Sequence, residues 1–220
     1  MIELFPYQKE GVTWLKTKRF ALLADEMGLG KSAQAIVAAD EIAADRILVL
    51  CPAVARPNWA NEFKKFSMRE RHVVIQESAA QSLPNARRIT HICSYDLALK
   101  TAPLLASQFD VVVLDEAHYL KSVAAGRSHL VFAKGGIAHK ASRVWALTGT
   151  PAPNHAGELW VLMRAYGLTP LGYDDFVARY CKVYYPAGQR RISGTNLEHI
   201  QEVRTALRRV MLRRMKNQVG

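Results

Sequence analysis

Residues 25–32, with the sequence DEMGLGKS, have the types and spacing that bind phosphate. Glycines let backbone N–H groups close around phosphate oxygens, because no Cβ stands in the way. Lys31 would reach the β- and γ-phosphates of a nucleotide, and the Ser32 hydroxyl would bind Mg²⁺. The general pattern has glycine where this chain has Asp25. The residues that we assign to nucleotide binding in this loop are Met27, Gly28, Leu29, Gly30, Lys31 and Ser32.

A second segment, Asp115-Glu116-Ala117-His118, follows an apolar run and supplies two adjacent carboxylates. Successive residues at a strand end point in different directions, so the two carboxylates can do different work. Asp115 is the natural partner of Mg²⁺, and Glu116 is the natural base or water-orienting group. The alternative is that this acidic pair only caps the N-terminus of a helix. The phosphate loop earlier in the sequence makes that alternative less favourable. Lys31, Asp115 and Glu116 are therefore the candidate catalytic residues, and Ser32 and Asp115 the candidate metal ligands.

Short apolar runs between helix-like segments must position these residues. Near-continuous apolar strands of this kind predict a mostly parallel sheet with helices on both faces, which is an α/β fold. Ligands of such sheets bind at the carboxyl ends of the strands. The predicted strands are Phe20–Ala24, Arg46–Leu50, His72–Gln76, Ile89–Cys93, Val111–Leu114 and Arg143–Leu147. Helices are expected at Ser32–Ala44 and from Pro57 to Phe66.

After residue 152 the pattern changes, and we expect a helical extension over 153–220 packed on a core domain of residues 1–152. Its expected helices are Glu158–Tyr166, Asp174–Cys181 and Leu197–Met215, with a loop at Pro186–Asn196. The last helix has an apolar stripe of period 3.6 and a second face rich in arginine. We expect this arginine face to be solvated or paired with acids.

The composition excludes several classes of protein. The chain has 220 residues, a net charge of +11 and 50% hydrophobic residues, so a sizeable core is expected and wholesale disorder is not. No apolar run is long enough for a membrane span, and the first residues do not resemble a secretory signal. Three widely spaced cysteines indicate neither a disulfide framework nor a metal knuckle. The charge fits nucleic acid as a partner, or a basic surface that only aids solubility.

Several motifs, in order, resemble the first RecA-like lobe of Swi/Snf-family ATPases, a branch of superfamily-two helicase-like proteins. The loop at residues 25–32 is close to that family's own version, which accounts for Asp25. The other segments that carry the resemblance are Leu4–Gln8, Leu48–Pro52, Ile92–Tyr95, Asp115–His118, Leu147–Pro151 and Met211–Arg214. Many eukaryotic relatives have Gly or Ser in place of Ala117, which leaves room for a bacterial or viral member or for a neighbouring helicase branch.

The resemblance implies a DNA-dependent ATPase that uses ATP and Mg²⁺ and translocates on double-stranded DNA. Gln8 would read the adenine. His118, Thr148, Gly149 and Thr150 would couple the nucleotide site to the DNA track. Contacts to the DNA phosphate backbone would come from Ser94, Tyr95 and Lys121, with Lys100 nearby.

The family's second lobe, with its arginine finger, has no counterpart in these 220 residues. We therefore expect weak or no hydrolysis by the chain alone, and a second RecA-like lobe as a partner in cis or in trans. The expected location is the cytoplasm, for a bacterial or viral protein, or the nucleus, and not the cell exterior.

Two alternatives stay open from the sequence. An RNA helicase lobe of the DEAH or DEAD type would share the phosphate loop and the Asp115-Glu116 pair. Those helicases usually carry Ser-Ala-Thr in place of Thr148–Thr150. The other alternative is a non-catalytic nucleic-acid-binding fragment, for which Lys31 would have no effect on ATP binding. A kinase or GTPase is disfavoured, because Gln8 and the adjacent carboxylates are not expected there.

Overall fold

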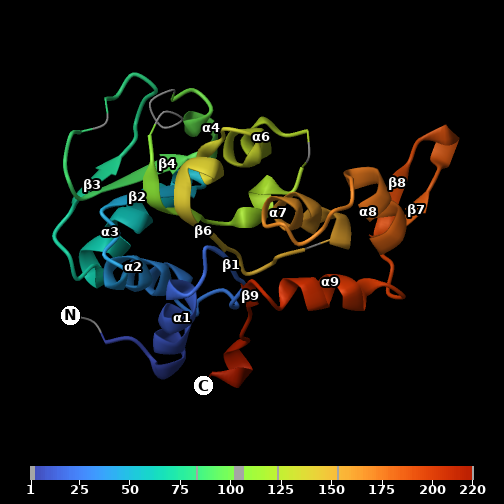
Figure 1. Ribbon diagram of the computed structural model, residues 1–220, viewed down its shortest axis with the longest axis horizontal. Helices are drawn as coiled ribbons and strands as arrows, with labels where there is room; N and C mark the ends of the chain where they lie inside the picture. Colours follow the sequence, from blue (N-terminus) through green and yellow to red (C-terminus); the bar gives the residue numbers. More distant parts are fainter. Residues whose placement is uncertain (1–2, 83, 102–106, 123, 153, 220) are drawn as a thin grey trace.

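The computed structural model describes residues 3–82, 84–101, 107–122, 124–152 and 154–219. Seven strands form one sheet in the order β3-β4-β2-β5-β6-β1-β9, and every neighbouring pair is parallel (Figure 1). They are β1 (Phe20–Leu23), β2 (Arg46–Cys51), β3 (His72–Ile75), β4 (Ile89–Ser94), β5 (Phe109–Leu114), β6 (Ala141–Leu147) and β9 (Met211–Leu212). The prediction of a parallel sheet with six of these strands is confirmed.

Helices cover both faces of the sheet, as the sequence predicts. The α-helices are α1 (Pro6–Lys16), α2 (Lys31–Glu41), α3 (Arg56–Phe66), α4 (Tyr95–Ala98), α6 (Gly126–Phe132), α7 (Trp160–Ala165), α8 (Tyr173–Tyr180) and α9 (Ile200–Leu207). Short 3₁₀ turns include η2 (Ala117–Leu120) and η4 (Ala156–Leu159). No described helix is both long enough and apolar enough to span a membrane.

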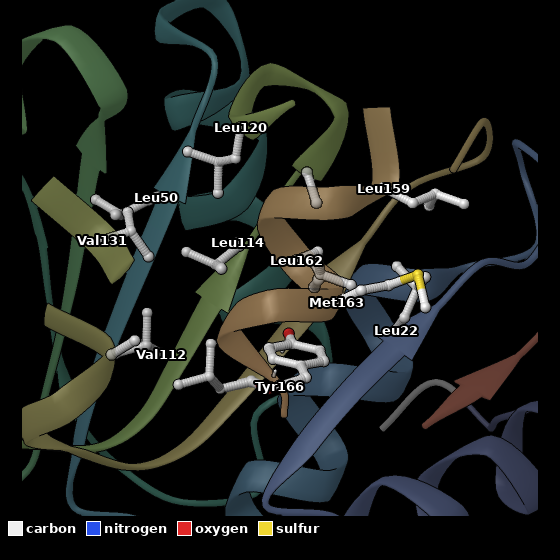
Figure 2. Packing of buried hydrophobic residues seen from close by; sticks show 14 of the residues in the cluster. Leu22, Leu50, Val112, Leu114, Leu120, Val131, Leu159, Leu162, Met163 and Tyr166 are labelled. Atoms are coloured by element: carbon white, nitrogen blue, oxygen red, sulfur yellow. Dashed lines mark hydrogen bonds between the residues drawn. The ribbon is translucent and has the colours of Figure 1, made fainter. Parts of the chain in front are cut away.

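Alternate residues of strands such as β2 and β5 enter two separate hydrophobic clusters, because successive side chains of a strand point to opposite faces. On one face Leu22 of β1 packs in a cluster with Met163 and Tyr166 of the α7 region (Figure 2). On the other face Leu23 belongs to a cluster with Trp59 of α3, together with residues of α1 and α2. Two packed faces make the sheet a rigid base for the loops at its edges.

The region after residue 152 is less helical than predicted. The stretch expected to be a loop, Pro186–Asn196, includes strand β8 (Arg191–Thr195), which pairs antiparallel with β7 (Cys181–Tyr184). Helix α9 spans only residues 200–207, whereas the sequence predicts a helix over 197–215. The first residue of the predicted extension, 153, lies outside the described residues.

Strand β9 explains why the predicted last helix is short. Without β9, strand β1 would be a sheet edge with unpaired backbone donors. The N–H groups of Leu22 and Ala24 instead donate to the carbonyl oxygens of Val210 and Leu212, at 2.7 Å in each case. Residues 211–212 therefore pair with the sheet instead of extending the predicted helix.

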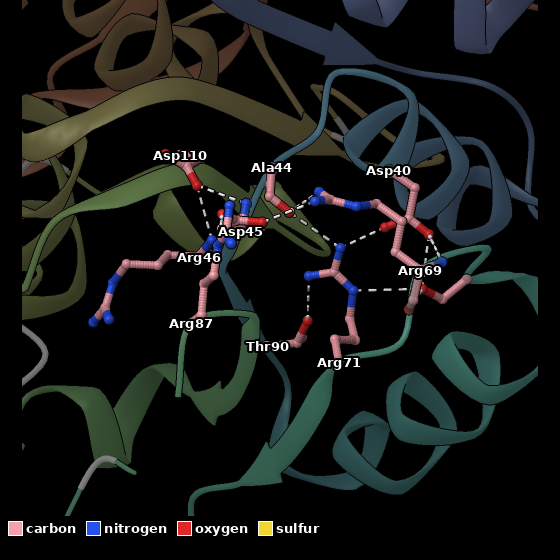
Figure 3. A network of polar contacts seen from close by, with 10 residues as sticks. Asp40, Ala44, Asp45, Arg46, Arg69, Arg71, Arg87, Thr90 and Asp110 are labelled. Carbon is pink, nitrogen blue, oxygen red and sulfur yellow. Dashed lines mark hydrogen bonds and ion pairs between the residues drawn. The ribbon is translucent and has the colours of Figure 1, made fainter. Parts of the chain in front are cut away.

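A polar network occupies the amino end of the sheet, away from the loops discussed below (Figure 3). The buried Asp40 carboxylate accepts hydrogen bonds from Arg71 and from the Ser67 hydroxyl. Asp110 accepts from the backbone N–H groups of Asp45 and Arg46 at 2.7 and 2.8 Å. These contacts fix the starts of β2 and β3, while the carboxyl ends of the strands carry the candidate site.

Candidate nucleotide-binding site

The phosphate loop lies between β1 and α2, as predicted. Gly28 and Gly30 have φ of 87° and 70°, a left-handed conformation that favours glycine. A Cβ added to Gly30 would lie 2.3 Å from Nε2 of Gln8, so this glycine is also required for close packing. Gly30 is the N-cap of α2, which leaves the first N–H groups of that helix available for an anion.

Lys31 is partly buried and faces the same loop. Its Nζ donates to the carbonyl oxygen of Asp25 at 2.8 Å and to that of Glu26 at 3.4 Å. Burial lowers the pKa of Lys31, and the carboxylates of Glu116, Asp25 and Asp115 oppose this shift. The lysine therefore senses charges from both predicted motifs, which lie close together in the fold.

Ser32 begins α2 next to Lys31, and its hydroxyl donates to the Glu62 carboxylate of α3 at 3.2 Å. To bind a metal ion, the Ser32 hydroxyl would have to exchange this contact for the ion. Glu62 is a neighbour that the sequence does not single out for this site.

Asp115 follows β5 and is held by three contacts. Its Oδ2 accepts from the indole Nε1 of Trp59 at 2.7 Å, and its Oδ1 from the backbone N–H of Glu116 at 3.0 Å. The buried Tyr95 hydroxyl donates to the backbone carbonyl of Asp115 at 2.8 Å. Burial raises the pKa of Asp115, and the Trp59 hydrogen bond counters this shift. A nearby cation would favour its charged form, which suits a carboxylate ligand for Mg²⁺.

Glu116 has an unusual backbone, with φ of 47° and ψ of 54°. A residue with a side chain pays a steric cost in this left-handed region, and such strain is found at functional sites. Nδ1 of His118 lies 3.1 Å from Oε2 of Glu116 but lacks hydrogen-bond geometry. The Glu116 carboxylate thus lies beside His118, whereas that of Asp115 accepts from Trp59.

The segment after β6 closes the third side of the site. A Cβ added to Gly149 would lie 2.9 Å from Cγ of Met27 and 3.8 Å from Nζ of Lys31. The Thr148 hydroxyl accepts from the backbone N–H of Thr150 at 3.1 Å, which shapes the turn. Residues that are distant in the sequence therefore meet around Lys31.

Gln8 lies against the phosphate loop from helix α1. Its Nε2 donates to the carbonyl oxygen of Leu29 at 3.3 Å, and its Oε1 accepts from the backbone N–H of Phe5 at 3.0 Å. The side chain is buried, so in this arrangement the amide orders the loop. Its predicted contact with adenine stays a prediction.

The residues predicted to touch DNA are less available than the sequence implies. Ser94 is buried and caps α4 by accepting from the N–H of Leu97, and Tyr95 is only 2% exposed. Lys121 pairs with Glu158 at 2.7 Å. Ser94 and Tyr95 therefore support β4 and Asp115 in this structure, and we do not propose them as direct DNA contacts.

The sequence misses two sets of residues around this site. Trp59 is buried in the hydrophobic core, and its indole N–H also orients Asp115. Asp25 is fully buried and paired with Arg214, a residue predicted to lie on a solvated or acid-paired face. Neither contact leaves a local pattern in the sequence, because the partners come from distant segments.

The residues present fit a nucleotide with its magnesium ion. The glycine cradle, the lysine that faces it and the helix N-terminus suit phosphate groups. Ser32 and Asp115 supply the oxygen ligands that Mg²⁺ prefers. Within the described residues there is no group of three or more His, Cys, Asp or Glu side chains that could hold a metal ion by themselves.

Comparisons with known proteins agree with this site. Residues 7–220 match the SNF2-related domain family. The chain is 30% identical to the mouse DNA annealing helicase and endonuclease ZRANB3, over 99% of this chain and 21% of that protein. It is 32% identical to the Caenorhabditis elegans homologue of SWI/SNF-related matrix-associated actin-dependent regulator of chromatin subfamily A-like protein 1, over 98% of this chain and 32% of that protein.

The fold also matches solved structures. The Sulfolobus solfataricus SWI2/SNF2 ATPase core in complex with double-stranded DNA superposes with a TM-score of 0.80 at 24% identity, over all of this chain and 47% of that chain. The predicted RecA-like fold is thereby confirmed. The chain spans about a fifth to a third of the two curated relatives. On the strength of its sequence motifs, its sheet and these matches, the chain belongs to the SNF2-related domain family of Swi/Snf helicase-like ATPases.

Proposed function

We propose that this chain forms the ATP-binding lobe of a Swi/Snf-type translocase on double-stranded DNA. The observation that carries the proposal is the meeting of three strand-end segments around Lys31: the phosphate loop, the Asp115-Glu116 pair and the turn at Gly149. A basic chain with a net charge of +11 is compatible with a polyanionic partner. Two relatives are named as DNA-acting or chromatin proteins, and one similar solved core is bound to double-stranded DNA.

In the proposed mechanism each residue of the site has a distinct task. The loop N–H groups and Lys31 bind the phosphates, and Gln8 would contact the adenine. Ser32 and Asp115 would hold Mg²⁺, which neutralises charge on the phosphates when bound. Glu116 would orient or deprotonate the attacking water.

Coupling to DNA and to a second lobe completes the proposal. His118 and the Thr148–Thr150 turn lie at the same edge and would transmit the nucleotide state to the DNA track. Efficient hydrolysis would need an arginine from a second RecA-like lobe, a contribution worth on the order of 10³–10⁵ in rate. We retain residues 1–152 as the proposed core and 153–220 as the extension, with β9 returning to the sheet. A protein of this kind works where DNA is, in a bacterial cytoplasm or a nucleus.

Binding of a fluorescent ATP analogue with Mg²⁺ tests the nucleotide site. Lys31→Ala removes a charged hydrogen-bond donor and should weaken affinity between about 10- and 100-fold, since such bonds contribute about 1.5–3 kcal/mol. Lys134→Ala is the matched control, because Lys134 is exposed and lies outside the site. Equal affinity of Lys31→Ala and the unmodified chain would favour the non-catalytic alternative.

DNA dependence tests the rest of the proposal. We expect slow hydrolysis by the 220-residue chain with or without duplex DNA, and duplex DNA should compete better than single-stranded RNA for binding. The logarithm of the binding constant should fall steeply with the logarithm of salt concentration, because contacts to phosphates release counterions. Robust DNA-stimulated turnover by the chain alone would show that no second lobe is needed. Preference for RNA would favour the RNA helicase alternative.

A further inference from the structure

The phosphate loop runs beside the segment that leaves the sheet near the C-terminal end of the chain (Figure 1). Backbone pairing continues past the strands, because the N–H of Glu26 donates to the carbonyl oxygen of Arg214 at 2.9 Å. The N–H of Lys216 also donates to the Glu26 carboxylate, at 2.8 Å. The first residues of the phosphate loop are therefore part of the same ladder as residues 210–216.

The Arg214 side chain reaches from this ladder into the core of the loop. Its Nε donates to Oδ1 of Asp25 at 3.0 Å, and a terminal nitrogen donates to Oδ2 at 2.5 Å. The same nitrogen donates to Oε1 of Gln34 at 2.7 Å, and the other one to the carbonyl oxygen of Tyr7. Asp25 is fully buried and the Arg214 side chain is 11% exposed. With bonds also from the Arg214 N–H and from Gln34, both oxygens of Asp25 are saturated.

Gln34 connects the Asp25–Arg214 pair to the backbone of the phosphate loop. Its Nε2 donates to the carbonyl oxygen of Leu29 at 3.2 Å, and Gln8 donates to the same oxygen from α1. In a planar trans peptide the C=O and the following N–H point in opposite directions. Two amides that hold the Leu29 carbonyl on one side therefore hold the Gly30 N–H toward the other. A phosphate bound in the loop would meet the Gly30 N–H on that side.

Helix α1 is shaped to admit this network. A Cβ added to Gly11 would lie 1.8 Å from Oε1 of Gln34 and 2.8 Å from a terminal nitrogen of Arg214. Glycine normally weakens a helix interior by roughly 0.5–1 kcal/mol relative to alanine. Here the missing side chain makes room for the amide and the guanidinium, which is a packing reason for Gly11.

We propose that Arg214 is a positioning residue for the nucleotide: it fixes Asp25 and Gln34, and through them the Leu29–Gly30 peptide, so that ATP affinity depends on the segment through which the chain leaves the sheet. This inference rests on the proposed ATP-binding function. Because coupling between two sites is reciprocal, bound nucleotide must in turn stabilise residues 210–216, although those residues carry none of the proposed phosphate ligands.

The test compares two neighbouring arginines. Arg214→Met removes the guanidinium at similar length, and Arg213→Met is the matched control because Arg213 is exposed. We expect Arg214→Met to weaken binding of a fluorescent ATP analogue with Mg²⁺ about tenfold, by analogy with the loss that follows removal of a residue that orients a metal ligand. Arg213→Met should change that affinity less than twofold. Equal affinities of the two variants would overturn the inference.

Hydrogen exchange gives a readout that a purely structural role would not change. In the unmodified chain, adding the Mg²⁺-bound analogue should slow amide exchange of residues 210–216, and in Arg214→Met this protection should be lost at saturating nucleotide. Unchanged protection in the variant would contradict the proposal. A lack of nucleotide binding by the unmodified chain would refute the proposed function itself, which is a separate result.

If Arg214→Met does not fold, Gly11→Ala is the second variant for the test, because it alters no charge. The new methyl group must displace the Gln34 amide, so affinity and the protection of residues 210–216 should fall together. Arg214→Lys keeps the charge but lacks the fork that grips Asp25 and Gln34 at once. Relative to Arg214→Met, the lysine variant should therefore restore more of the folding stability than of the nucleotide affinity. Full recovery of both by lysine, or no loss in Gly11→Ala, would overturn the inference.

Discussion

Two Asp-Glu pairs stand at the carboxyl edge of the same sheet, one after β1 and one after β5, and they differ in their partners. Asp25 is fully buried and is neutralised by the Arg214 guanidinium, while Glu26 accepts a backbone N–H from the same segment. Among the described residues, the Asp115 carboxylate accepts from N–H groups of Trp59 and Glu116 and forms no ion pair, and burial raises its pKa. Glu116 adopts a left-handed backbone.

The difference separates a structural carboxylate from an available one. A carboxylate that is saturated by a cation from its own chain has no capacity left for a ligand. A partly desolvated carboxylate that has no direct ion pair gains more when a metal ion arrives. Thus the first pair ties the phosphate loop to the rest of the domain, and the second pair keeps capacity for the proposed magnesium ion and water.

Neutralising each aspartate should give the largest contrast. Asp25→Asn leaves the Arg214 charge buried without its partner, and removal of one member of a buried pair costs about 3–5 kcal/mol. Asp115→Asn leaves no buried cation, but its single amide oxygen cannot accept from both Trp59 and Glu116. Its loss should therefore be smaller, about 1–2 kcal/mol. Urea unfolding of both variants at pH 7 measures this. Equal losses would show that the two aspartates have the same structural role.

Acid titration can sharpen the comparison once the contribution of His91 is removed. His91 is buried in β4, and neither ring nitrogen has a hydrogen-bond partner. Burial, helped by the Arg46 charge, lowers the pKa of His91 from 6.5 to about 4. The unfolded chain therefore binds a proton near pH 6.5 that the folded chain refuses until about pH 4. Stability should fall by about 3 kcal/mol between pH 7 and pH 4 from this group.

His91→Leu supplies the control for that titration. The difference between the unfolding free energies of the two proteins should be flat above pH 7 and change steadily from about pH 6.5 to 4. What remains in His91→Leu then reports the carboxylates, including the two aspartates. Parallel pH curves for the two proteins would mean that His91 is not kept neutral by the fold.

Much of the sheet and both motifs can be predicted from the sequence, because their signals are local. Apolar runs such as Val111–Leu114 predict buried strands, and the glycines before Lys31 predict a loop that closes on phosphate. The second half of the chain gives weaker signals. The apolar stripe that ends near Met211 favours one long helix. In the structure, Met211 and Leu212 instead pair with the edge of β1 as strand β9.

The partners within the site could not be predicted, because they depend on contacts between distant segments. Arg214 lies 189 residues from Asp25, and an ion pair leaves no periodic pattern. The hydrogen bonds of Trp59 and Tyr95 could not be predicted from the sequence for the same reason. An apolar setting predicts that an aromatic ring is buried, but not that its N–H or O–H is directed at Asp115. The resemblance to a family assigned Tyr95 to DNA, and the fold uses it to support the site.

Removing the indole donor from Asp115 should have an intermediate effect. Trp59→Phe keeps most of the buried ring but leaves Oδ2 of the carboxylate without its donor. Hydrogen bonds to charged groups contribute about 1.5–3 kcal/mol, so we expect a loss of about 2 kcal/mol in urea unfolding. Trp145→Phe is the matched control, because its Nε1 donates to the neutral carbonyl oxygen of Lys18 at 3.1 Å. A loss in Trp145→Phe as large as in Trp59→Phe would mean that the charge of Asp115 does not matter.

The smallest expected effect concerns the two glutamates, and its sign differs between them. Glu116 has φ of 47°, a conformation that costs a residue with a side chain about 1–2 kcal/mol, whereas glycine adopts it freely. Against this, glycine makes the unfolded chain more flexible by roughly 0.5–1 kcal/mol, so Glu116→Gly should stabilise the fold by about 0.5 kcal/mol. Glu26→Gly gains no such relief and loses the acceptor for the Lys216 N–H, so it should destabilise by about 1 kcal/mol. Urea unfolding of the pair measures both signs. Destabilisation by Glu116→Gly would mean that its strain is offset by contacts, whereas stabilisation would indicate that the site keeps a strained glutamate at the expense of stability.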